Sequence, residues 1–160
     1  MKPLMAILAM LALGAMAGCS KSSSPAAGEA KPAKHEHHPP HGGTPVVLGE
    51  EVYHLELVLD AAAGKVQAFI LDGEMESFIR SSAPSFEVVA TVEGRPQSLV
   101  FRAVANPATG ETVGDSSLFE AQAGWLKATA SFEAELKSLT IRGTTFTGVK
   151  FNFPKGNDRD

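Results

Sequence analysis

The fold is decided by one alternating stretch of the sequence, Val52-Tyr53-His54-Leu55-Glu56-Leu57-Val58-Leu59-Asp60. Every second residue from Tyr53 to Leu59 is apolar, so these side chains fall on one face of an extended chain. A turn at 61–64 leads into a second alternating stretch at 65–72. Two consecutive period-two stretches predict β-strands rather than helices.

Further alternating stretches follow, separated by turns that are rich in glycine and proline. They predict strands at 85–93, 97–104, 118–122, 139–142 and 144–153. This pattern is typical of an all-β fold, and we expect an antiparallel immunoglobulin-like β-sandwich of about seven to eight strands. Little helix is expected beyond one or two turns within 121–136, where Trp125 should fill part of the core.

The N-terminus resembles the signal of a bacterial lipoprotein. A short apolar run from Leu4 to Ala17 ends in Met16-Ala17-Gly18-Cys19, which resembles a lipobox. The resemblance implies cleavage before Cys19 and lipid on its sulfur. Because no aspartate follows the cysteine, it also implies an anchor in the outer membrane on the periplasmic side. An ordinary secretory signal with a chance cysteine is the alternative.

Composition divides the chain into four expected parts: a signal peptide at 1–18, a lipidated, flexible, His-rich linker at 19–43, the β-sandwich domain at 44–154 and a polar tail at 155–160. The linker lacks large apolar residues and cannot bury enough surface to fold. The net charge of −4 and the absence of a basic patch argue against nucleic acid as a partner. Since the only cysteine is the lipidation site, the domain should fold without a disulfide or any cofactor.

The five histidines all fall in one part of the chain, at His35, His37, His38, His41 and His54. Imidazole is the commonest protein ligand for transition metals, so the cluster predicts metal binding. His54 and Glu56 are two residues apart on a predicted strand, which places their side chains on one face, roughly 7 Å apart. That face also carries Val58 and Asp60, so we expect it to be only partly buried.

The candidate ligands are therefore His41, His54 and Glu56, with further donors from the histidine tract: His38, His37 and His35. A hairpin turn at 49–50 would place Val46 opposite His54. His41 would then lie beyond the end of the strand, and the glycines at 42–43 would let the chain double back so that His41 approaches His54. After signal cleavage no thiol and only one methionine remain, so Zn²⁺, Cu²⁺ or Ni²⁺ fits the donors better than Cu(I).

Residues 41–57 also resemble an element of periplasmic heavy-metal efflux and resistance proteins, in which H-G-G is followed by Y-H-x-E-L. The resemblance implies a metal-handling module with His41 and His54 as the matching histidines and Glu56 as the matching carboxylate. It also implies components of a metal-efflux system as partners. The chain lacks the heptad hairpin and lipoyl-like motifs of the transport adaptors, so it is not expected to be an adaptor itself. The resemblance then implies an accessory protein of metal homeostasis or efflux.

Interpretations without a metal are also compatible with the sequence. His54 would be a hydrogen-bonded strand histidine without metal, Glu56 would pair with a cross-strand lysine or arginine, and the tract would be a solvated spacer. The protein would then be a structural or interaction lipoprotein whose β-sandwich binds a protein partner, and an exposed apolar patch around Met75, Phe78 and Ile79 would favour that function. An enzyme is not expected, because no free thiol, G-x-S-x-G motif or phosphate-binding glycine loop is present.

Overall fold

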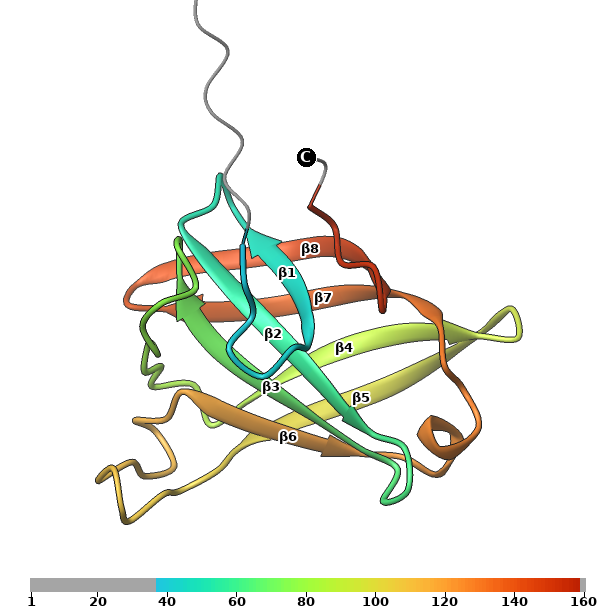
Figure 1. The fold of residues 1–160 in the computed structure, drawn as a ribbon, viewed down its shortest axis with the longest axis horizontal. Coiled ribbons are helices and arrows are strands. Elements are labelled where there is room, and N and C mark those ends of the chain that lie inside the picture. The colour runs from blue at the N-terminus through green and yellow to red at the C-terminus, as the bar shows by residue number, and fades with distance from the viewer. Residues whose placement is uncertain (1–36, 159–160) are drawn as a thin grey trace, which may run out of the picture. The chain divides into compact units, whose positions relative to one another are not determined.

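The computed structural model describes residues 37–158, so the predicted signal peptide, Cys19 and His35 lie outside the described residues. In this part of the chain (Figure 1) the elements are β1 (Thr44–Leu48), β2 (Tyr53–Asp60), β3 (Lys65–Asp72), β4 (Ser85–Val92), β5 (Arg95–Ala103), β6 (Leu118–Gln122), the 3-10 helix η1 (Gly124–Lys127), β7 (Phe132–Ile141) and β8 (Thr144–Phe153). Within residues 37–158, no helix has the length and apolar character needed to span a membrane.

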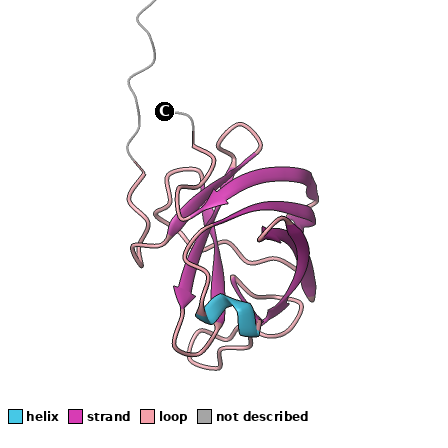
Figure 2. Ribbon diagram, turned by 90° about the vertical axis from the view of Figure 1, so that its right-hand side faces the viewer, coloured by secondary structure: helices cyan, strands magenta, loops and turns pink. Residues whose placement is uncertain are grey.

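The eight strands of the described part form one antiparallel sheet in the order β1-β2-β3-β6-β5-β4-β7-β8. The sheet curls until β1 contacts β8, and its two halves face each other across a shared core (Figures 1 and 2). The expected all-β, antiparallel, sandwich-like fold with little helix is confirmed. Its two layers are halves of a single hydrogen-bonded sheet.

Local patterns explain where the strands lie. The bounds predicted for β3, β6 and β8 are confirmed. β7 begins at Phe132, seven residues before the predicted start at 139, because Phe132, Ala134 and Leu136 are buried at a spacing of two. The predicted helical turn is η1, where Leu126 is buried and Trp125 lies edge-on to Phe132 with 5.3 Å between ring centroids.

The C-terminal residues cover the outer edge of β1. The side-chain amide of Asn157 pairs with the backbone of Val47: Val47 N donates to Oδ1 at 2.7 Å, and Nδ2 donates to the Val47 carbonyl at 3.2 Å. At Gly156 an added Cβ would collide with the Pro45 carbonyl oxygen. The predicted polar tail is therefore held against β1 as far as Asn157, because the Asn157 amide satisfies backbone groups of an otherwise unpaired strand edge.

Glu111 is a buried carboxylate in the loop between β5 and β6. Its oxygens accept hydrogen bonds from the backbone and hydroxyl of Ser117, at 2.8 and 2.6 Å, and from the hydroxyl of Thr109 at 2.7 Å. Burial raises the pKa of Glu111, but the hydrogen bonds from Ser117 and Thr109 outweigh burial and hold the pKa below its ordinary value. The ionised form is thus favoured in the folded state.

A depressed carboxylate pKa contributes stability that is present above the unfolded-state pKa and is lost as the pH falls through the folded-state value. We therefore expect Glu111→Gln to lower the free energy of unfolding at pH 7 by on the order of 1–2 kcal/mol. The difference from wild type should shrink at pH 3. Urea denaturation at both pH values measures this, with the exposed Glu74→Gln as the control. A difference that does not change with pH would contradict the expectation.

Candidate metal centre

β2 is buried on both of its faces over the four residues His54 to Leu57. Leu55 and Leu57 point into the main core, while His54 and Glu56 point to the opposite side and are both 0% exposed. The partly open face expected from the sequence is found at Val58 and Asp60, which are half-buried and exposed, but at His54 and Glu56 the segment His37–Gly43 (the histidine segment) packs over the face through contacts to both side chains. In Figure 1 this segment precedes β1 and runs beside β2.

The register of β1 against β2 differs from the prediction by one residue. Val47, not Val46, lies opposite His54, because the turn that joins the two strands takes the four residues 49–52. A shift of one residue exchanges the two faces of a strand. Val46 consequently points into the core, where it is fully buried, and Val47 belongs to the face of His54.

Glu56 holds the end of the histidine segment. One carboxylate oxygen accepts the backbone N–H groups of His41 and Gly43, at 2.7 and 2.9 Å, and the other lies 2.8 Å from His41 Nδ1. Because an ionised carboxylate only accepts hydrogen bonds, Nδ1 of His41 is the donor in this contact. Glu56 thus pairs with His41 in place of the lysine or arginine considered from the sequence, and both of its oxygens are engaged.

The glycines let the chain reach this carboxylate. Gly42 has a positive φ of 66°, and the chain turns back there so that His41 reaches Glu56, whereas the sequence predicted an approach to His54. An added Cβ at Gly43 would lie 2.6 Å from the carbonyl oxygen of Leu57, so the close approach to β2 requires glycine. The His41 ring then stacks on Phe69 of β3, with 4.0 Å between centroids and 17° between planes.

His54 is set for ligation by its own hydrogen bond. Its Nδ1 lies 3.2 Å from the carbonyl oxygen of Asp72, which only accepts, so Nδ1 carries a proton. Nε2 is buried and has no hydrogen-bond partner among the described residues. Burial lowers the pKa of His54, although the hydrogen bond to Asp72 acts in the opposite direction. The ring is therefore neutral near pH 7, and its Nε2 carries a lone pair that could bind a metal ion.

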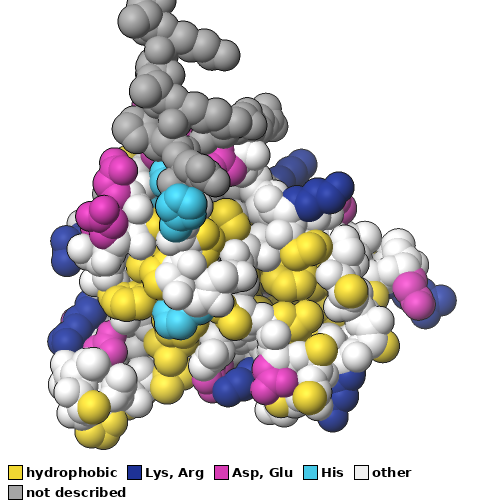
Figure 3. Space-filling view, in the orientation of Figure 1, with side chains coloured by type: hydrophobic (Ala, Val, Ile, Leu, Met, Phe, Trp, Pro, Cys, Tyr) yellow, Lys and Arg dark blue, Asp and Glu magenta, His cyan; other side chains and the backbone are white. Residues whose placement is uncertain are grey.

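His37 lies against His54, with 4.4 Å between ring centroids and 57° between ring planes. Its side chain is only 4% exposed, and its Nδ1 is 3.4 Å from Oδ2 of Asp158. His38, by contrast, is exposed. The structure thus brings together His37 with His54 and, separately, His41 with Glu56. Figure 3 shows histidine side chains at two separate places on this face, with apolar side chains between them.

Asp158 is the residue of this site that sequence reasoning missed. It stands 121 positions from His37 in a polar tail that has no strand pattern, so no local signal pointed to it. Among residues 37–158, no three histidine, cysteine or acidic side chains are already arranged as a metal site. The described side chains therefore provide possible metal ligands as two pairs, His37 with His54 and His41 with Glu56.

The patch that would favour a protein-binding role is small. Met75 and Ile79 are buried, at 2% and 7% exposure, and only Phe78 is open to solvent, at 48%. Phe78 lies beside Phe69 and the His41 ring, at 6.0 and 5.8 Å between centroids. One exposed phenylalanine is ordinary for a protein surface and defines no interface.

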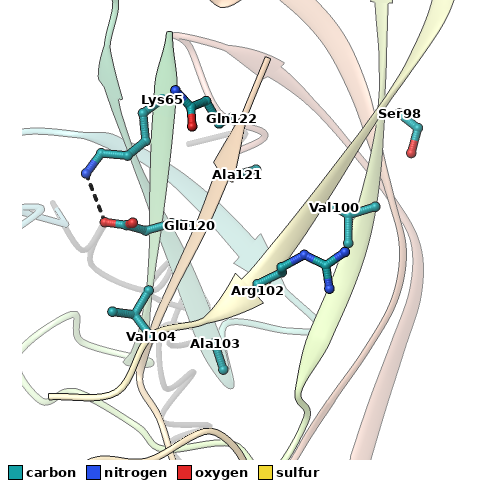
Figure 4. A pocket seen from close by; sticks show the side chains of 9 residues that line it. All are labelled: Lys65, Ser98, Val100, Arg102, Ala103, Val104, Glu120, Ala121 and Gln122. Atoms are coloured by element: carbon teal, nitrogen blue, oxygen red, sulfur yellow. Dashed lines mark hydrogen bonds and ion pairs between the residues drawn. The ribbon is translucent and has the colours of Figure 1, made fainter. Parts of the chain in front are cut away.

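A hollow of about 540 Å³ opens elsewhere, where β5 and β6 diverge, and Figure 4 shows the side chains that line it. Lys65 and Glu120 form an ion pair at 3.0 Å across its wall, and Gln67 donates to the same carboxylate at 2.7 Å. Burial raises the pKa of Glu120, but the hydrogen bonds from Lys65 and Gln67 hold it below its ordinary value. No histidine or cysteine is among the lining residues, so the hollow lacks the donors found at β2.

No protein-family model matches this chain, and no curated protein or solved structure matches it either. Its function must therefore be inferred from the chemistry of its own side chains. The most distinctive of these is the buried, unprotonated nitrogen of His54.

Proposed function

We propose that this protein binds a divalent transition metal, Zn²⁺, Cu²⁺ or Ni²⁺, at the outer face of β2 through His54 and His37. The observation that carries the proposal is the buried Nε2 of His54, which has no hydrogen-bond partner among the described residues. An unsatisfied buried acceptor costs about 1–3 kcal/mol. A metal ion would satisfy this nitrogen, and its lone pair is already free for coordination.

The surroundings of His54 support the same chemistry. Histidines that ligate metals usually donate their other ring N–H to a carbonyl or carboxylate, which fixes the tautomer and the ring orientation. Asp72 supplies that acceptor to His54, and Glu56 supplies it to His41. Because the pKa of His54 is lowered by burial, protons compete only weakly with a metal at this nitrogen near neutral pH.

The N-terminal sequence supports a location for this activity. The apolar run that ends at Cys19 resembles a lipoprotein signal, and residues 20–36 would tether the domain to the membrane. We place the protein on the periplasmic side of the bacterial outer membrane, anchored by lipid on Cys19. A metal-binding domain held there would serve metal homeostasis or efflux as an accessory to the transport system.

The test is calorimetric titration with each of the three metals. The chain is used without its signal peptide and with Cys19→Ser, which prevents lipidation and removes the thiol as a ligand. We expect one metal per chain, and we expect His54→Leu or His37→Ala to weaken binding by about 10–100-fold. His38→Ala is the matched control, since His38 is exposed in the same segment.

His54→Leu is informative because it need not unfold the domain. The Asp72 carbonyl keeps a second donor, the N–H of Met75 at 3.2 Å, and leucine fills most of the space with apolar atoms. We therefore expect metal-free His54→Leu to be within about 1 kcal/mol of wild type in stability. If wild type binds no metal, or if His38→Ala weakens binding as much as the other two, the proposal fails. The first result would favour a protein-binding lipoprotein.

A further inference from the structure

We infer that Asp158 is a ligand of the same metal, so that the ion joins the histidine segment to the C-terminal tail. The inference rests on the proposed function and adds a residue that neither the histidine pattern nor the strand pattern indicates. It makes the site a set of two imidazoles and one carboxylate, from His37, His54 and Asp158. These donors come from three separate parts of the chain.

The distance between His37 and Asp158 is one argument. Nδ1 of His37 and Oδ2 of Asp158 are 3.4 Å apart, longer than the roughly 2.7–2.9 Å of a charge-assisted hydrogen bond. Around a tetrahedral ion with bonds of about 2.0–2.1 Å, neighbouring ligand atoms are separated by roughly 3.3–3.5 Å. A spacing of 3.4 Å is thus compatible with two ligands of one ion. The ring of His54 lies against His37 on the same side of β2.

The anchoring of the tail is a second, independent argument. Asn157, which precedes Asp158, is bonded through its side-chain amide to both backbone groups of Val47. Val47 is the residue of β1 that lies opposite His54. The tail is therefore fixed at the position along β1 that brings its next residue beside the two histidines. His54 is already oriented by its hydrogen bond to the Asp72 carbonyl, and binding would require the His37 and Asp158 side chains to turn toward it, because no three described side chains are already arranged as a metal site.

The donor set suggests how the site would work. Two neutral imidazoles and one carboxylate suit Zn²⁺ or Cu²⁺, and they leave one position of a tetrahedral site for water or an incoming donor. An open position allows a metal to be passed to another ligand, as an accessory of metal transport requires. Since the ligands lie in the histidine segment, β2 and the tail, bound metal would also hold both ends of the domain in place.

The experiment compares wild type with Asp158→Asn and, as the control, Asp160→Asn, which removes the same charge from the same tail. All carry Cys19→Ser and lack the signal peptide. Zn²⁺ affinity is measured by competition with a chelator, and the Cu²⁺ complexes are compared by electron paramagnetic resonance. We expect Asp158→Asn to weaken Zn²⁺ binding by about tenfold or more and to change the Cu²⁺ spectrum. Asp160→Asn should do neither.

Two failures are distinguishable in this experiment. If wild type binds metal and Asp158→Asn binds it equally well with an unchanged Cu²⁺ spectrum, Asp158 is not a ligand, and the proposed function stands without it. If wild type binds neither metal, the proposed function fails and the inference fails with it. Equal weakening by Asp158→Asn and Asp160→Asn would assign the effect to net charge and overturn the inference.

Discussion

Glu56→Ala should lower the free energy of unfolding by about 3–5 kcal/mol and release the histidine segment from β2. The Glu56 carboxylate is fully buried and accepts hydrogen bonds from His41 N, Gly43 N and His41 Nδ1. Alanine leaves these donors without an acceptor and creates a cavity beneath them. The donors regain water only if the segment lifts away, and lifting exposes the face of β2 that the segment covers.

Urea denaturation measures the change in stability, and amide hydrogen exchange at His41 and Gly43 measures the release of the segment. Glu74→Ala is the control, because Glu74 is exposed. Glu56→Gln should fall between wild type and alanine, since its amide oxygen still accepts a hydrogen bond while its amide nitrogen faces other donors. If Glu56→Ala unfolds within about 1 kcal/mol of wild type, the carboxylate does not hold the segment.

The strands could be predicted from the sequence because each carries its own pattern. Val66, Ala68 and Ile70 recur at a spacing of two, and β3 occupies the predicted residues 65–72. β6 and β8 follow the same rule. The order of the strands in the sheet could not be predicted in this way, because it depends on which strand edges pair in space. No single alternating stretch encodes this order.

The candidate site was predictable in its residue types but not in its partners. The histidine segment has little apolar surface, so the sequence indicates a solvated linker. The segment is held by hydrogen bonds to one buried carboxylate, Glu56, and by ring contacts of His41 with Phe69 and of His37 with His54. The register error has a similar origin: Glu51 takes a positive φ of 59° within the four-residue turn, a conformation that is uncommon outside glycine.

The two polar ends of the described part of the chain lie at neighbouring strands, β2 and β1. The histidine segment is held on β2 by Glu56, and the tail is held on β1 by Asn157. Both anchors are single polar side chains that bond to backbone groups. Hydrogen bonds of this kind need two segments of main chain to lie close together. In the sequence this need is visible mainly as the glycines at 43 and 156, where a Cβ would collide with the neighbouring strand.

Gly43→Ala should therefore displace the histidine segment while leaving the sheet intact. The added Cβ would lie 2.6 Å from the Leu57 carbonyl oxygen, 2.8 Å from Cγ of Glu56 and 2.9 Å from Cγ2 of Val58. The first of these atoms is backbone in the middle of β2, which pairs on both sides and cannot retreat. We expect a loss of about 2–3 kcal/mol in the free energy of unfolding, together with faster hydrogen exchange at His41.

Two other glycines separate this steric effect from general effects of alanine. At Gly124 the added Cβ meets nothing within 4 Å and φ is not positive, so Gly124→Ala should be nearly neutral. At Gly42 the Cβ is equally free, but φ is +66°, so Gly42→Ala should cost only the strain of a left-handed conformation, about 1 kcal/mol. Metal affinity, if present in wild type, should fall most in Gly43→Ala, because displacing the segment moves His37 away from His54. If Gly43→Ala, Gly42→Ala and Gly124→Ala are equally stable, the added Cβ at position 43 does not collide with β2. The histidine segment would then lie farther from β2 than the structure places it.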